Sequence, residues 1–131
     1  MTEGVKYLRY HGVMTTGIDA HYYLAKDLQR AIGFYRDALG LEPATNFGAG
    51  VEYVLPDDTA FGIGSMPNGE WYPGGGVMFA VSDIEGGAER VRAAGGATLS
   101  GVMDYPTCMT VWCNDTEGNN FALHHLKSKE S

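Results

Sequence analysis

Basic residues are scarce in this sequence of 131 residues. Lys and Arg together number 9 against 16 Asp and Glu, which gives a formal net charge of -7. No Lys or Arg cluster stands out, whereas a nucleic-acid-binding domain normally carries a basic patch. We therefore expect no nucleic-acid partner. Solubility is a sufficient explanation for the acidity, and steering of a cationic ligand is the alternative.

Cysteine and long apolar runs are also scarce. Cys108 and Cys113 are the two cysteines, and on one strand they would point to opposite faces, too far apart to form a disulfide. No apolar run approaches the roughly 20 residues of a membrane helix. Residues 1–17 lack the basic and apolar regions of a signal peptide. We expect a cytoplasmic protein with reduced thiols and no membrane partner.

Several enzyme signatures are missing as well. The sequence has no phosphate-binding G-x-x-x-x-G-K-[ST] motif and no G-x-S-x-G nucleophile motif. The run Gly74-Gly75-Gly76 is better explained as a turn, because no strand and helix flank it in the order that a dinucleotide site needs. The sequence therefore indicates neither a common class of hydrolase nor a nucleotide-dependent enzyme.

A regular pattern begins at residue 18. Residues 18–25 are typical of a strand, and Asp27 is placed to cap a helix that runs to Leu39 with apolar residues at helical spacing. Gly40 follows where a left-handed C-terminal residue belongs. Three strands are then expected near 42–47, 50–55 and 59–64. This order of strand, helix and three strands defines one unit.

The same unit recurs in the second half. A strand is expected at 76–81, a helix capped by Ser82 or Asp83 running to about Ala94, and strands near 97–102, 107–113 and 119–126. An offset of 56 aligns the two helices, and an offset of 60 aligns Phe61 with Phe121. Residues 65–75, rich in Pro and Gly, link the halves and could form a wall or lid. Such a repeat predicts two similar units that pack against each other.

Two segments resemble the vicinal oxygen chelate superfamily, which includes glyoxalase I, extradiol dioxygenases and bleomycin-binding proteins. They are AKDLQRAIGFYRDALGLEP at 25–43 and DTEGNNFALHHLK at 115–127. The resemblance implies an α+β domain with two tandem βαβββ modules, whose curved eight-stranded mixed sheet surrounds a cleft with the helices outside. It also implies a homodimer. The boundaries expected are an extension (1–17), module one (18–64), the linker (65–75), module two (76–127) and a tail (128–131).

The metal-ligand positions of the family carry no donor side chains here. Carried over residue by residue, they are Ala20, Gly62, Gly76 and Ala122. Because such a metal needs His nitrogen or carboxylate oxygen at these positions, we expect no metal and no other cofactor. His21 and His124 are the alternative ligands. Strand alternation puts His124 on the face of Ala122 and His21 opposite Ala20, unless the register shifts near residues 19–22.

Polar and aromatic residues remain that could line the cleft and bind a ligand. They are Tyr22, Trp71, Tyr72, Cys108, Thr110, Trp112 and His124. Tyr22 could instead pack in the core, and Trp71 could cover the protein beneath the linker. Alternation puts Cys108, Thr110 and Trp112 on one face of their strand, but does not decide whether that face is the cleft. His124 is the sole candidate for a catalytic role.

Three interpretations follow. The favoured one is a metal-free protein that binds a small aromatic or polycyclic molecule in its cleft. The second is an enzyme of this superfamily, a lyase, dioxygenase or thiol transferase, with a metal on His21 or His124 or with His124 as general base. The third is a structural or regulatory domain whose own side chains fill the cleft.

Overall fold

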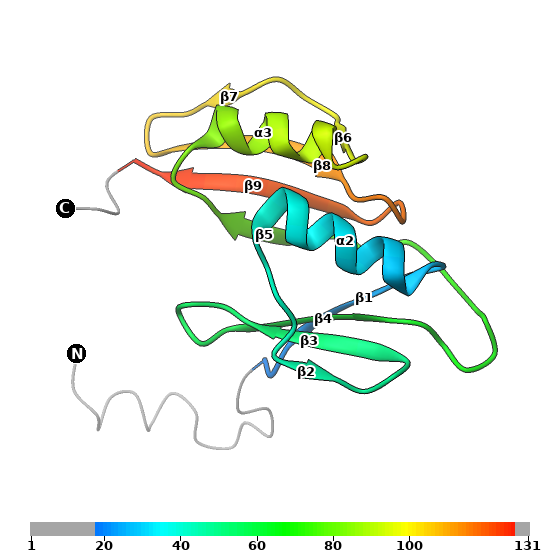
Figure 1. The fold of residues 1–131 in the computed structure, drawn as a ribbon. Helices are drawn as coiled ribbons and strands as arrows, with labels where there is room; N and C mark the ends of the chain where they lie inside the picture. The colour runs from blue at the N-terminus through cyan, green and yellow to red at the C-terminus, as the bar shows by residue number, and fades with distance from the viewer. Residues whose placement is uncertain (1–17, 128–131) are drawn as a thin grey trace, which may run out of the picture.

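The computed structural model describes residues 18–127, and they form two successive strand–helix–strand units (Figure 1). The first unit contains β1 (His21–Leu24), α2 (Leu28–Leu39), β2 (Thr45–Asn46), β3 (Gly50–Val54) and β4 (Ala60–Gly64). The second unit contains β5 (Val77–Ala80), α3 (Ile84–Ala93), β6 (Ala97–Thr98), β7 (Met103–Asp104), β8 (Cys108–Asn114) and β9 (Asn120–Leu126). The repeated order expected from the sequence is therefore present.

The strands form two open mixed sheets. One has the order β1-β4-β3-β2, and the other has the order β5-β9-β8-β6 with β7 also paired to β8. In each sheet the first strand of the unit runs parallel to the last, and the remaining pairs are antiparallel. The predicted α+β architecture with two tandem modules is confirmed, with the strands divided between two sheets.

Side-chain caps define where both helices begin. The Asp27 carboxylate accepts a hydrogen bond from the backbone N–H of Arg30 at 3.1 Å, and Asp83 accepts one from Gly86 at 3.0 Å. Of the two caps considered for the second helix, Asp83 is thus the one formed. Gly40 ends α2 with φ of 71°, a left-handed conformation that glycine adopts without a steric penalty. The helix boundaries follow directly from these local signals.

One expected strand is interrupted. The prediction of a single strand at 97–102 is wrong, because only β6 and β7 pair with β8 there. Between them the hydroxyl of Ser100 accepts the hydrogen bond from Trp112 N at 3.1 Å. A side chain therefore takes the place of a backbone carbonyl at this point, and the backbone leaves the ladder until Met103.

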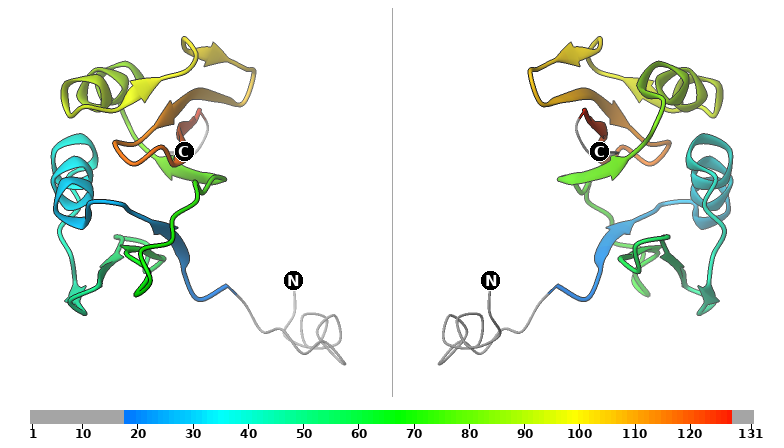
Figure 2. Two further views of the ribbon diagram at one scale, coloured as in Figure 1. Left: turned by 90° about the vertical axis from the view of Figure 1, so that its right-hand side faces the viewer. Right: turned by 90° about the vertical axis from the view of Figure 1, so that its left-hand side faces the viewer.

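Both helices of residues 18–127 cover the same side of the two sheets, and in this part of the chain no helix covers the opposite side (Figure 2). The covered side holds an aromatic core in which the ring of Tyr35 packs against three phenylalanines on three strands: Phe61, Phe79 and Phe121. Because side chains alternate along a strand, the neighbours of these core residues project from the other side. We call that side the open strand face.

Candidate functional site

Tyr22 lies on the open strand face over a floor of glycines. Its register partner on β4 is Gly62. A Cβ atom added to Gly62 would lie 2.6 and 2.8 Å from two ring carbons of Tyr22, and one added to Gly50 would lie 2.5 Å from its hydroxyl. Gly64 likewise has room for no side chain beneath that hydroxyl. The ring therefore packs closely on bare backbone, while 56% of Tyr22 stays exposed.

This geometry decides one question about Tyr22. The alternative of core packing does not apply, because the core position on β1 is taken by Tyr23, which is 1% exposed. The sequence analysis missed the floor beneath Tyr22, although glycines at alternate positions in a strand signal a close approach by another group. Such an approach is what Gly62 and Gly64 allow.

Four of the other predicted residues lie together on the open strand face of the second sheet. Thr110 pairs with His124, and Trp112 pairs with Ala122, across β8 and β9. Val111 and Cys113 are buried on the covered side, so alternation assigns Cys108, Thr110 and Trp112 to the open strand face. The structure thus answers the question of which face of β8 these residues occupy.

His124 is half-buried between Thr110 on β8 and Ala80 on β5. Within residues 18–127 its imidazole makes no hydrogen bond. No side chain in this part of the protein orients the ring as a general base requires. The Sγ atom of Cys108 is 4.0 Å from the Thr110 hydroxyl, which makes this hydroxyl its close polar neighbour.

His21 points to the covered side, as alternation predicts. It pairs with Phe61, and no register shift occurs along β1. Its ring packs edge-on against Tyr23 at 5.7 Å, and Nε2 lies 3.3 Å from the carbonyl oxygen of Gly75. His21 and His124 therefore project from opposite faces and cannot share a metal through the open strand face.

The residues at the family's metal positions do not fit a metal. Ala20, Gly62, Gly76 and Ala122 offer no donor atom. At Gly62 the direction that a ligating side chain would take is filled by the ring of Tyr22. Within residues 18–127 there is also no group of three His, Cys, Asp or Glu residues placed to hold a metal ion. No metal chemistry is therefore derived from these positions.

The linker residue Trp71 lies away from the open strand face. The Lys26 ammonium sits 4.0 Å from its ring centroid, and a Cβ on Gly118 would be 3.4 Å from the indole. Trp71 thus covers the junction before α2 and the β8–β9 turn, which favours the alternative that it packs on the protein itself. Tyr72 is 62% exposed and has no partner within the described residues.

A buried polar cluster in the β8–β9 turn joins the two modules. The Glu117 carboxylate accepts hydrogen bonds from Lys26 N at 2.8 Å, Asp27 N at 3.0 Å and Arg30 Nε at 2.6 Å. Burial raises the pKa of Glu117, but these hydrogen bonds and the charge of Arg30 together leave it below its usual range. The cluster fixes the end of β1, and hence Tyr22, against module two.

Asp115 extends this cluster into the core. It accepts a hydrogen bond from the Tyr35 hydroxyl at 2.6 Å and two from the backbone N–H groups of Glu117 and Asn119. Burial, followed by the charge of Asp115, raises the pKa of Tyr35 well above its usual range, so the phenol remains a donor. The sequence analysis placed Asp115 only within the segment that carries the family resemblance and did not identify this role.

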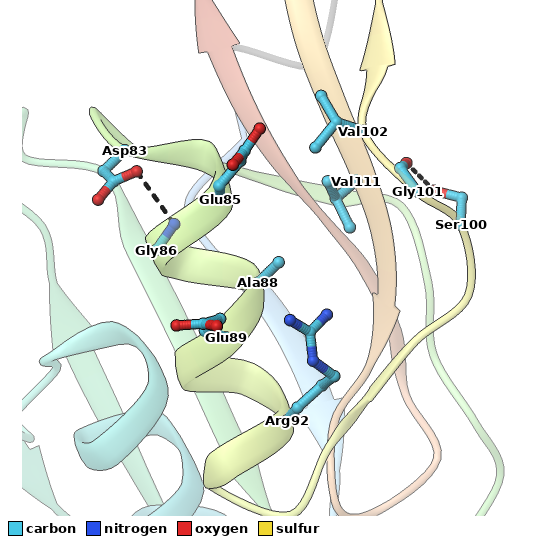
Figure 3. Close-up of a pocket in the computed structure, with 10 residues that line it drawn as sticks. All are labelled: Asp83, Glu85, Gly86, Ala88, Glu89, Arg92, Ser100, Gly101, Val102 and Val111. Atoms are coloured by element: carbon cyan, nitrogen blue, oxygen red, sulfur yellow. Dashed lines mark hydrogen bonds between the residues drawn. The ribbon is translucent and has the colours of Figure 1, made fainter.

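A separate pocket lies between α3 and the segment that joins β6 to β7 (Figure 3). Its volume is about 520 Å³, with Ala88 and Val111 among the apolar residues that line it. Glu85, Glu89 and Arg92 also line it. No residue predicted to bind a ligand lines this pocket, which is on the helix side of the second sheet.

Parts of the open strand face are exposed in the single chain, although Thr110 and Ala122 on that face are only 4% and 0% exposed. Besides Tyr22, the side chains of Val54, Met78 and Leu126 project from this face and are 54%, 46% and 42% exposed. The open strand face is therefore exposed at these side chains, as an unfilled face would be. None of the helices in residues 18–127 is long and apolar enough to cross a membrane.

An α+β protein with two strand–helix modules and an open strand face has many structural counterparts. The chain matches the family model of the Glyoxalase/Bleomycin resistance protein/Dioxygenase superfamily over residues 17–123. It therefore belongs to this superfamily. A comparison with functionally curated proteins gives no match.

Solved structures share the fold at low sequence identity. A glyoxalase/bleomycin resistance protein from Albidiferax ferrireducens is 21% identical, with a TM-score of 0.70 over 82% of this chain and 97% of that one. TnmS3, an antibiotic binding protein from Streptomyces, is 16% identical, with a TM-score of 0.69 over 88% and 99%. A lactoylglutathione lyase from Agrobacterium tumefaciens is 20% identical, with a TM-score of 0.65 over 86% and 95%. At these identities the likeness establishes the fold alone.

Proposed function

We propose that this protein binds a small aromatic or polycyclic molecule on its open strand face, without a metal. The observation that carries the proposal is the ring of Tyr22, which lies on a glycine floor where a metal-binding relative would carry a ligating side chain. A ring held on one side by backbone and exposed on the other is a ready surface for stacking. Trp112 supplies a second aromatic group on the same face.

The second sheet supplies polar groups to orient such a ligand. His124 and Thr110 are neighbours across β8 and β9, and the imidazole has no partner within residues 18–127. Apolar surface with few placed polar groups is typical of small-molecule sites. The antibiotic-binding neighbour TnmS3 shows that this fold is compatible with such a role.

The open strand face needs a cover before it can enclose a ligand. We propose that a second copy of the chain supplies it, in a homodimer, because apolar side chains such as Met78 and Leu126 are left exposed. The free thiols of Cys108 and Cys113 suit a reducing compartment such as the cytoplasm.

Catalysis by His124 is the second candidate function. A half-buried histidine whose ring makes no hydrogen bond within residues 18–127 could move a proton, and a lyase is among the structural neighbours. The absence of a group that orients the imidazole within residues 18–127 favours binding over catalysis.

Two measurements test the proposal. Protein purified without chelators or a metal-affinity tag should contain less than about 0.1 equivalent of transition metal per chain, as an unfilled donor set implies. A panel of planar aromatic and polycyclic compounds should then include members that raise the melting temperature of the wild type and not of Tyr22→Ala. Near-stoichiometric metal, or a panel without any stabilising compound, would contradict the proposal.

A further inference from the structure

Among the described strands, Glu52 is the one charged residue whose side chain lies on the open strand face. In the strands of residues 18–127, Lys and Arg do not occur, and Glu52 and Asp104 are the acidic residues. Asp104 lies beside Met109 on the covered side and pairs with Lys127 at 2.5 Å. Glu52, in contrast, has no hydrogen bond or ion pair within the described part of the chain. Residues 18–127 thus provide no counter-ion for this half-buried carboxylate.

The carboxylate of Glu52 and the ring of Tyr22 belong to one subsite. Glu52 pairs with Gly62 from the β3 side, and Tyr22 pairs with the same glycine from the β1 side. Neighbouring strands lie about 4.8 Å apart, and Gly62 has no side chain to separate the two groups. Because the ring of Tyr22 leans over Gly62, its exposed surface lies beside the Glu52 position.

From this arrangement we propose that the ligand is an organic cation, whose positive charge lies against the Tyr22 ring and Glu52. The inference rests on the proposed function and names the class of ligand. A neutral aromatic molecule that covered Glu52 would remove water from an unpaired carboxylate, which costs free energy without compensation. A cation restores a partner to the carboxylate and is attracted by the negative surface of the ring.

The distribution of charge elsewhere supports the same class of ligand. The described basic residues lie on the helices, at the junction before α2 or, as Lys127, just after β9. None of them belongs to a strand of the open strand face, so an anionic ligand would find no counter-ion on the strands there. The net charge of -7 adds a general attraction for cations that salt screens.

Two probes with the same three-ring skeleton test the inference. N-methylacridinium carries a permanent positive charge, and acridine at pH 8 is neutral. Isothermal titration calorimetry should show that wild-type protein binds the cation at least about tenfold more tightly, as a cation on an aromatic ring beside a carboxylate implies. In Glu52→Gln this preference should disappear while the affinity for acridine stays the same or rises. Glu52→Lys should bind 9-anthracenecarboxylate more tightly than N-methylacridinium.

The matched control is Glu89→Gln, which makes the same change of net charge on an exposed position of α3. It should keep the wild-type preference. Equal affinities of the two probes for the wild type would overturn the inference and leave the proposed function standing. An equal loss of preference in Glu89→Gln would assign the effect to net charge and overturn the role of Glu52. If neither probe binds, the inference is overturned, and the wider panel decides whether the proposed function is lost with it.

Discussion

Removing the Glu117 carboxylate is the sharpest test of how the two modules hold the site together. The side chain of Glu117 is 0% exposed, whereas that of its ion-pair partner Arg30 is 51% exposed. Glu117→Ala leaves the backbone N–H groups of Lys26 and Asp27 without their acceptor. Buried hydrogen bonds to a charged group contribute about 1.5–3 kcal/mol each, and an ion pair with a half-exposed arginine adds at most about 1 kcal/mol.

We expect a loss at the lower end of this sum, because water can reach part of the exposed junction. Glu117→Ala should therefore lower the free energy of unfolding by about 3 kcal/mol. For a domain of this size the melting temperature should fall by about 10 °C. Glu117→Gln retains one acceptor oxygen and should lose about 2 kcal/mol. Chemical denaturation measures both values. Glu89→Gln, an exposed carboxylate on α3, should change stability by less than about 0.5 kcal/mol.

The pH dependence gives an independent check on the same group. Because the folded protein lowers the pKa of Glu117, its ionised form stabilises the fold above the ordinary value of 4.5, and this contribution is lost as the pH falls through the lowered pKa. The stability difference between wild type and Glu117→Gln should consequently narrow in acid. The reasoning is refuted if Glu117→Ala is no less stable than Glu89→Gln, or if the difference stays constant down to the acid transition.

Two further predictions concern the open strand face and the thiols. In Gly62→Ala the new Cβ would lie within 2.8 Å of the Tyr22 ring, so the exposed ring must move. We expect a stability loss of about 1 kcal/mol. The affinity for aromatic ligands should fall at least about tenfold. The control is Gly101→Ala, whose Cβ would meet nothing within 4 Å. It should match the wild type in stability and in affinity for aromatic ligands. Equal affinities of Gly62→Ala and Gly101→Ala would contradict the role of the glycines beneath Tyr22. Burial raises the pKa of Cys113 to about 11, so iodoacetamide at pH 8 should alkylate the half-buried Cys108 in native protein and Cys113 only after unfolding. Peptide mass spectrometry distinguishes this outcome from equal labelling.

Local sequence signals predicted the ends of the first helix and the faces on which the strand histidines lie. Asp27 and Gly40 mark the ends of α2 because a cap and a left-handed glycine act within one helical turn. The faces of His21 and His124 also followed from alternation, since β1 and β9 contain no bulge across their paired residues. The break after β6 could not be predicted, because it depends on a hydrogen bond between Ser100 and a residue on another strand.

The site depends on contacts between segments far apart in the sequence, and these could not be predicted. Glu117 binds the backbone of Lys26, 91 positions away, and a turn sequence carries no sign of that partner. The environment of Tyr22 likewise requires three strands in register. The importance of Glu52 became visible only in the structure, where β3 pairs it with Gly62 and the described strands carry no basic residue. Alternation in the sequence predicted which residues share a face of a strand. The partners of each side chain depend on contacts between distant segments, which the sequence alone does not reveal.

The glycine at position 62, where the family resemblance places a metal ligand, is better explained by the ring above it than by the lack of a metal alone. If the position had only lost its ligand, an alanine such as Ala122 would serve equally well. Gly62 is instead one of three glycines beneath Tyr22, and a Cβ on any of them would meet the side chain of Tyr22 at 2.8 Å or less. Gly50 and Gly64, which are not metal positions, are kept small by this contact and by the backbone beside them, because a Cβ on Gly64 would also lie 2.9 Å from the carbonyl oxygen of Ala49, and one on Gly50 3.1 Å from that of Ile63. The three glycines therefore let the Tyr22 side chain pack closely on the backbone while 56% of the residue stays exposed, and an exposed aromatic ring is a surface on which a ligand can stack.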